Sequence, residues 1–271
     1  MLKIQKSLIE AQLQMKADKI NILNIDISIS NIDDLLQRSS LLIDNNQKFY
    51  ICTVNAFLAV RANEDKWLLT ILNKADIVVP DGMPIVWYSR FLKKTLPGRI
   101  SGFEFFYNFS KIANTKKYSY FFLGGENEKI LDMIKQKLNR EFSNIEVKGI
   151  LSPPFMEEFP DEFDNQMVKT INKYRPDVLW VGLSAPKQEK WIYKNIKRLD
   201  IKMAFGVGAA FNFYAGSVKR APVWMQKAGL EWLFRMFAEP GRLFKKYLVN
   251  NMKFLMLVSS DIFKRTFCKN N

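Results

Sequence analysis

One aspartate of the chain, Asp81, stands where a proton-transfer residue would be useful. It lies in the segment Pro80-Asp81-Gly82, directly after the apolar run Ile77-Val78-Val79. A strand that ends there delivers a carboxylate to a crevice, and the following glycine lets a ligand approach closely. The chain contains no histidine, so acid–base chemistry falls to Asp, Glu, Lys, Tyr or an activated water. Asp81 is the leading candidate for a base that deprotonates an attacking hydroxyl; the alternative is an aspartate that only shapes a turn.

A second polar pair, Thr53 and Asn55, follows the hydrophobic run Phe49 to Val54. At the end of a strand these side chains are suited to hydrogen-bond sugar hydroxyls. The alternative is that Asn55 caps the helix that follows it. The local pattern leaves both interpretations open.

Two glycine-rich turns follow predicted strands. Gly124 and Gly125 precede a helix, as in a turn that cradles a phosphate, and Gly206-Val207-Gly208 has the same form. The full dinucleotide motif GxGxxG is missing. A tight turn without a ligand explains the glycines equally well.

The loop at 182–189 gathers several polar groups at one strand end. Gln188 is placed to hold a donor's sugar or base, and Lys187 is placed to meet a phosphate. Glu189 is expected instead to cap a helix or to pair within the loop. We favour a binding role, because a turn alone seldom needs so many polar groups.

The elements that position these residues alternate between strands and helices. Strands are predicted at 20–29, 49–54, 77–79, 118–123, 177–181 and 203–207, and helices from 31, over 56–75 and over 128–142. This alternation predicts an α/β fold with a mostly parallel sheet covered by helices on both faces. Ligands of such sheets bind beyond the carboxyl ends of the strands, where each candidate residue lies.

The charge is large and uneven. The chain has 271 residues and a net charge of +14, and the segment from residue 216 holds eleven of the 41 Lys and Arg but only three of the 27 Asp and Glu. Such a basic end favours an anionic partner: phosphates, acidic lipid or nucleic acid. We therefore expect a boundary near 215, with a catalytic α/β domain at 20–215, an appendage at 216–271 and an N-terminal extension at 1–19.

The sequence also indicates a compartment. Cys52 and Cys268 have no metal-type spacing and form no disulfide framework, which favours a reducing environment. We find neither a secretory signal nor the roughly 20 apolar residues that a membrane-spanning helix needs.

From Arg242 onward, a helix would place apolar residues on one face and basic residues on the other, which is typical of a membrane-surface helix; the alternative is an ordinary core helix. The apolar residues predicted to share that face are Phe244, Tyr247, Leu248, Met252, Leu255 and Val258.

Taken together, these segments resemble the WecG/TagA/CpsF family of glycosyltransferases. The resemblance runs from about residue 20 to about residue 250 in the family's order. The segments that carry it are TVNAF, PDGMP, RISG at 99–102, FFLGG, VGLSAPKQE, GVGAAFNFYAG, KRAP and GLEWLFRMFAEPGR.

The resemblance implies roles for particular residues. Asp81 would be the catalytic base, and Thr53, Asn55 and Gln188 would line the donor and sugar pocket. Three arginines of the appendage would complete the site over the donor diphosphate: Arg220, Arg235 and Arg242. The fold would be Rossmann-like, the reaction would invert the anomeric centre, and neither a metal nor another cofactor would be needed. The absence of a DxD pair agrees, since arginines and loop amides would then stabilise the leaving group.

The resemblance also implies the substrates. The donor would be UDP-N-acetylmannosamine or its uronic acid, and the acceptor an undecaprenyl-diphosphate-linked amino sugar in teichoic acid or surface polysaccharide synthesis. The alternative within the family is a hexosyltransferase of capsule synthesis that uses UDP-glucose or UDP-galactose. The enzyme would be cytoplasmic and attached peripherally to the inner face of the membrane. The sequence leaves a homo-oligomer open.

Two other classes were weighed. A nucleotide-dependent oxidoreductase would need the dinucleotide motif after the first strand, with an acidic residue about 20 positions later. A nucleic-acid-binding or scaffold protein would use the basic, aromatic segment 224–247. We expect no nucleic-acid partner, because the apolar face of the tail suits lipid better than bases.

Overall fold

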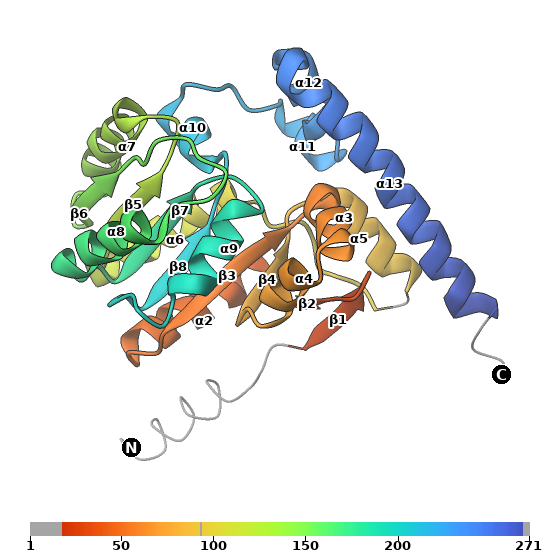
Figure 1. Ribbon diagram of the computed structural model, residues 1–271, viewed down its shortest axis with the longest axis horizontal. Helices are drawn as coiled ribbons and strands as arrows, with labels where there is room; N and C mark the ends of the chain where they lie inside the picture. The colour runs from red at the N-terminus through yellow and green to blue at the C-terminus, as the bar shows by residue number, and fades with distance from the viewer. Residues whose placement is uncertain (1–17, 93, 268–271) are drawn as a thin grey trace.

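The structure, a computed structural model, describes residues 18–92 and 94–267, without the side chains of Arg242 and Lys246. Within these residues the centre is a six-stranded sheet with the order β4-β3-β8-β7-β5-β6 (Figure 1). The strands are β3 Phe49–Val54, β4 Ile77–Pro80, β5 Ser119–Gly124, β6 Glu146–Leu151, β7 Val178–Gly182 and β8 Met203–Gly206. Neighbouring strands in this sheet pair in parallel. The predicted α/β fold is confirmed, and most of the predicted extension at 1–19 lies outside the described residues.

Helices cover both faces of the sheet because its central strands are apolar on both sides. In β7, Trp180 packs into one hydrophobic core, while its neighbours Leu179 and Val181 pack into the other. The helices on the Trp180 side are α2 Ile32–Asp44, α6 Gly102–Lys116, α7 Glu128–Glu141 and α10 Ala210–Ala215. Those on the opposite side are α3 Ala56–Glu64, α4 Lys66–Asn73, α5 Met83–Phe91, α8 Asp161–Tyr174, α9 Lys187–Asn195 and α13 Pro240–Phe267.

Two predicted elements are interrupted. The predicted strand 20–29 is an antiparallel hairpin of β1 Lys19–Ile22 and β2 Ile25–Ser28, because Leu23 and Asn24 both adopt left-handed backbone conformations. The predicted helix 56–75 breaks at Asp65, whose carboxylate accepts hydrogen bonds from two backbone N–H groups at the start of α4. In both places the apolar pattern continues through the break, so periodicity did not reveal it.

The carboxyl ends of β5 and β7 approach each other unusually closely. Gly125 donates its N–H to the carbonyl of Gly182 over 3.0 Å. Gly124 has φ +106°, and a Cβ added there would lie 2.6 Å from the carbonyl carbon and oxygen of Gly182. The glycine pair is therefore required by strand packing, and the N–H of Gly125 is already engaged.

After α10 the chain leaves the body. Gly216, with φ +81°, ends that helix, and the following segment leads to α11 Val223–Lys227 and α12 Glu231–Ala238 (Figure 1). The predicted boundary near 215 is close to this helix end and stays a prediction. The long helix α13 then returns along α3 and α5. Lys253 pairs with Glu64 at 2.5 Å, and Tyr88 donates to Asp261 at 2.5 Å.

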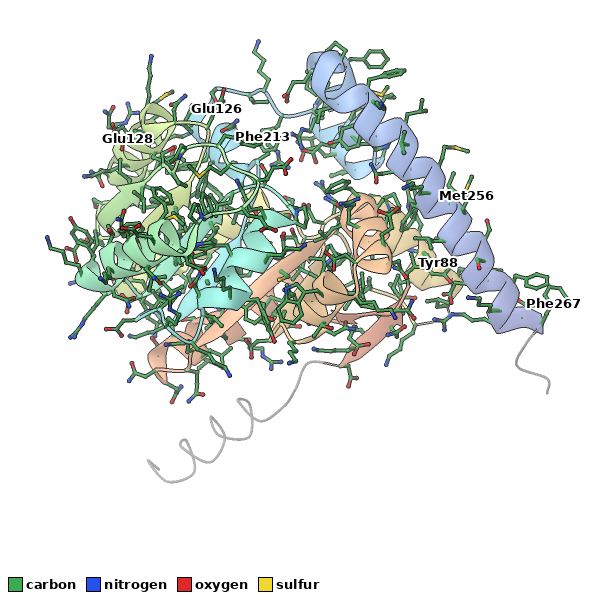
Figure 2. All side chains as sticks on the ribbon, viewed as in Figure 1. Tyr88, Glu126, Glu128, Phe213, Met256 and Phe267 are labelled. Atoms are coloured by element: carbon green, nitrogen blue, oxygen red, sulfur yellow. The ribbon has the colours of Figure 1, made fainter. Side chains whose placement is uncertain are left out.

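Helix α13 has two apolar faces, whereas the sequence predicted one. Tyr247 and Val258 were expected on the same face as Phe244, but both are partly buried, Tyr247 against Trp232 of α12 and Val258 against the core. Leu243 and Phe254 are buried as well. The outer face, on which Figure 2 labels Met256 and Phe267, points away from the body. Its exposed apolar residues are Phe244, Leu248, Val249, Met252, Leu255, Met256, Phe263 and Phe267. No helix of residues 18–92 and 94–267 combines the length and apolar content needed to cross a bilayer.

Replacing Gly124 by alanine should destabilise the fold, because the new methyl group meets the backbone of β7 at a left-handed φ. We expect Gly124→Ala to lower the free energy of unfolding by at least about 2 kcal/mol. Urea unfolding followed by circular dichroism measures this. Gly98→Ala is the matched control: a Cβ there meets nothing within 4 Å, so its effect should stay within about 0.5 kcal/mol. Equal stability of the two variants would contradict the close packing.

Candidate active site

Asp81 is held at the carboxyl edge of the sheet by its neighbours on both sides. Its N–H donates to the carbonyl of Val54 at 2.8 Å, and the N–H of Ile100 donates to the carbonyl of Pro80 at 2.8 Å. Asn55 lies beside Gly82, since a Cβ on that glycine would be 3.4 Å from the Asn55 Cβ. The ends of β3 and β4 and the loop before α6 therefore fix the aspartate between them.

The Asp81 carboxyl group is poised to exchange a proton near neutral pH. Its pKa is raised from 3.8 to about 7, chiefly because the carboxylate is removed from water. The guanidinium of Arg99 opposes that rise, Glu231 adds to it, and Arg235 and Arg220 also oppose it. No described side chain donates a hydrogen bond to this carboxylate, so it is open to a substrate hydroxyl.

An ion-pair group that sequence reasoning missed surrounds Asp81. Glu231, at the start of α12, pairs with Arg99 at 2.5 Å, and its other oxygen lies 3.6 Å from Nε of Arg220. The paired Arg99 and Glu231 side chains are each 15% exposed. Sequence placed Arg99 only within the RISG segment, and nothing in its spacing indicated that it would face residue 81.

Aromatic rings orient the two appendage arginines. The Arg220 guanidinium lies 4.5 Å from the centroid of the Phe103 ring and 5.7 Å from that of Phe213. Arg235 lies 5.4 Å from the same Phe213 ring. Figure 2 labels Phe213 on α10, next to the segment that leads to α11. The structure thus brings Arg220 and Arg235 together with Asp81, as expected, while the side chain of Arg242 lies outside the described residues.

Asn55 does what the alternative interpretation predicted. Its Oδ1 accepts a hydrogen bond from the N–H of Leu58 at 3.0 Å and caps α3. Its amide nitrogen has no partner among the described residues, and the side chain remains half-buried beside Gly82. Thr53 lies two residues earlier in β3, opposite Val79, and is 9% exposed.

Gln188 connects two strand-end loops. Its Oε1 accepts from the N–H of Gly208 at 3.0 Å, and its Nε2 donates to Glu189 at 2.8 Å. Gln188 is only 2% exposed, and a Cβ on Gly206 would lie 2.9 Å from its Nε2. Glu189 is fully buried, and burial raises its pKa to about 7. The pairing within the loop that was predicted as an alternative for Glu189 is therefore confirmed.

Lys187 is turned toward a different segment. Its ammonium donates to the carbonyl of Met156 at 2.6 Å and lies about 5 Å from the ring centroids of Phe155 and Phe159. Burial lowers its pKa. The ammonium is thus engaged by the loop before α8, and the expected phosphate contact stays a prediction.

Within the described ranges, no three Asp, Glu, Cys or His side chains gather in an arrangement suited to a metal ion. The charges that act on Asp81 are those of the three arginines already described and of Glu231. A carboxyl group with a pKa near 7 among arginines, at the strand ends of an α/β sheet, is chemically able to accept a proton from one substrate beside an anionic second one.

Comparison with known proteins identifies the family of the chain. Residues 20–267 match the model of the Glycosyl transferase WecG/TagA/CpsF family. The chain belongs to this family and is a glycosyltransferase.

Curated relatives share most of their length with it. An N-acetylglucosaminyldiphosphoundecaprenol N-acetyl-beta-D-mannosaminyltransferase of Bacillus subtilis (strain 168) is 29% identical over 91% of this chain and 93% of its own. Proteins of the same name in Bacillus spizizenii and Staphylococcus aureus (strain MRSA252) are 30% and 29% identical, over 84% and 83% of this chain and 86% and 87% of theirs.

The raised pKa of Asp81 predicts a pH-dependent cost in stability. From pH 4 to pH 8 the unfolded chain loses this proton first, so ionisation progressively favours unfolding. We expect the stability of Asp81→Asn, relative to the unsubstituted protein, to rise by on the order of 2–4 kcal/mol between these pH values. Urea unfolding at each pH measures this.

The exposed aspartate of α7 supplies the control. Asp132→Asn, at an exposed position, should show no comparable change with pH. A gap between Asp81→Asn and the unsubstituted protein that stays constant from pH 4 to pH 8 would mean that Asp81 titrates as an ordinary surface carboxylate.

Proposed function

We propose that this glycosyltransferase moves an N-acetylmannosamine-type sugar from a UDP-sugar to an N-acetylglucosaminyl-diphosphate-linked undecaprenol, with inversion at the anomeric carbon. The curated relatives are named for this acceptor and this sugar. The observation that carries the proposal is the Asp81 carboxyl group, with its pKa of about 7 among three arginines. The product would be a building block of a cell-surface polymer such as teichoic acid.

The proposed reaction is a single displacement. The acceptor hydroxyl oxygen attacks the anomeric carbon while Asp81 accepts the hydroxyl proton. The bond between the anomeric carbon and the UDP oxygen breaks on the opposite face, which inverts the configuration. A base with a pKa near 7 suits this step, because a substantial fraction of it is deprotonated at neutral pH and it is still basic enough to take the proton. Asp81 then releases the proton to solvent.

Arginines would stabilise the leaving group. Arg99, Arg220 and Arg235 approach Asp81 from the body and from the appendage, and guanidinium groups pair well with diphosphate oxygens. Their attraction is strongest where water is excluded, and the aromatic rings of Phe103 and Phe213 shield part of this region. Arg242 is proposed to join them, and Thr53, Asn55 and Gln188 to shape the donor pocket from the strand ends.

Helix α13 is proposed to rest on the membrane that carries the acceptor. Its outer face exposes Phe244, Leu248, Met252 and Met256 between 50% and 64%, a continuous stripe rather than scattered residues. The inner face holds the helix to α3, so the outer stripe is not needed for folding. Apolar residues with nearby lysines such as Lys245 suit an anionic lipid surface.

Asp81→Asn should abolish most transfer while it preserves the fold and UDP binding. General-base catalysis contributes roughly 100- to 10,000-fold, so we expect kcat to fall by that factor. A radiolabelled or coupled UDP-release assay with a prenyl-diphosphate sugar acceptor measures it. In the unsubstituted enzyme, activity should rise with pH through about 7. Full activity of Asp81→Asn, with Asp132→Asn as the matched control, would exclude Asp81 as the base.

Met252→Glu should weaken membrane binding. A carboxylate in the apolar stripe must be desolvated on contact with lipid, and we expect affinity for phosphatidylglycerol vesicles to fall roughly tenfold in a sedimentation assay. The control is Met133→Glu, at an exposed position of α7 in the body. This variant should bind the vesicles as the unsubstituted protein does. Equal losses in both variants would indicate a general charge effect and not a docking face on α13.

A further inference from the structure

A hollow of about 360 Å³ opens beside two of the arginines that act on Asp81, Arg99 and Arg220. It lies between α6 and α11. Met83, two residues after Asp81, lines one side, and Arg99 and Arg220 line another. Its volume falls within the range of small-molecule sites. The hollow therefore adjoins the arginines proposed for the diphosphate, and its wall comes within two residues of the proposed base along the chain.

The wall that α6 contributes has an unusual composition for a helix that packs on a sheet. Phe103, Glu104, Tyr107 and Asn108 form its outer face and are only half-buried. The residues between them, including Phe105 and Phe106, lie in the core. One helix thus presents two aromatic rings, a carboxylate and an amide to the hollow.

These groups are held in place. The rings of Phe103 and Tyr107 are within 4° of parallel, with centroids 6.2 Å apart, and form a flat apolar wall. Asn108 donates to the carbonyl of Glu104 at 3.0 Å and accepts from Lys111 at 2.9 Å.

Among these residues of α6, Glu104 has the side chain that is available to a ligand. The carboxylate of Glu104 interacts electrostatically with Arg99, whose pKa it helps to raise, and no described residue hydrogen-bonds to it. A carboxylate accepts hydrogen bonds from two hydroxyl groups, and an aromatic ring packs against the apolar face of a sugar.

We propose that this hollow binds the sugar ring of a hexosyl diphosphate, with the hydroxyls at Glu104, the ring against Tyr107 and the diphosphate toward Arg99 and Arg220. This inference rests on the proposed function, which brings two hexosyl diphosphates to Asp81: the nucleotide-linked donor and the lipid-linked acceptor. Both have the chemistry that the hollow recognises. Binding experiments with each substrate separate them.

The test measures equilibrium binding of three probes to the full chain. They are UDP-N-acetylmannosamine, N-acetylglucosaminyl-diphosphofarnesol in detergent, and UDP without a sugar. We expect Glu104→Ala to lower the affinity for one of the two hexosyl diphosphates roughly tenfold and to leave the affinity for UDP unchanged, because only the sugar contact is lost. The hexosyl diphosphate whose binding is weakened is the one that occupies the hollow. Glu104→Gln, which keeps a hydrogen-bond acceptor, should restore part of the affinity.

Glu146→Ala is the matched control, an exposed glutamate at the start of β6, at the opposite edge of the sheet. It should bind all three probes as the unsubstituted protein does, and thermal melts should show that each variant is folded. Unchanged affinity of Glu104→Ala for both hexosyl diphosphates would overturn the inference. The inference would also be overturned if Glu104→Ala weakened the binding of UDP without a sugar as much as that of a hexosyl diphosphate. The effect would then lie at the diphosphate and not at the sugar.

The proposed function is judged separately, by sugar transfer in the unsubstituted enzyme. If transfer occurs and Glu104→Ala keeps both affinities, the function stands and the sugar site is wrong. If no transfer occurs but Glu104→Ala selectively loses a hexosyl diphosphate, the site stands and the function is wrong. Failure of the unsubstituted protein to bind either hexosyl diphosphate would refute the site.

Discussion

The structure depends on the balance of charge around one desolvated carboxyl group. Removing Asp81 from water raises the free energy of its ionised form, and Glu231 adds to this penalty. Arg99, Arg220 and Arg235 offset part of it. The pKa of Asp81 is therefore about 7, above that of a surface aspartate but below that of a buried carboxyl group without positive neighbours. A stronger positive field would make the carboxylate a poor base, and a weaker one would keep it protonated at neutral pH.

The balance is assembled from distant parts of the chain. Asp81 and Arg99 belong to the body, whereas Arg220, Glu231 and Arg235 follow the end of α10. Glu231 joins the two groups, because it pairs with Arg99 and approaches Arg220. The site is therefore complete only while α12 and α13 rest on the body. The apolar inner face of α13 and the Lys253–Glu64 pair hold them there. Exposed ion pairs contribute little by themselves, so the apolar contact of Phe254, Leu257 and Val258 with the core is the main attachment.

Several residues that look functional in the sequence also have structural roles. Gly124 allows two strand ends to approach, Asn55 caps a helix, and Gln188 ties the β7 loop to the β8 loop. These roles arise from the same crowding at the carboxyl edge that places Asp81 there, and they do not prevent Asn55 from presenting its amide to a ligand. Lys187 shows the limit of sequence reasoning: its loop was identified, but its direction was set by contact with Phe155, Phe159 and Met156.

The sequence by itself determined the alternation of strands and helices, the strand ends at Asn55, Asp81 and Gly124, and the need for a base other than histidine, because periodicity and residue type are local properties. Tertiary structure decided which residues meet. The left-handed turn at Leu23-Asn24, the two apolar faces of α13, and the position of Arg99 and Glu231 beside Asp81 follow from packing between segments that are distant in the sequence. Arg99 and Glu231 are 132 positions apart, and the Lys253–Glu64 pair of α13 and α3 spans 189. Side-chain direction and desolvation depend on those partners, and no local pattern encodes them.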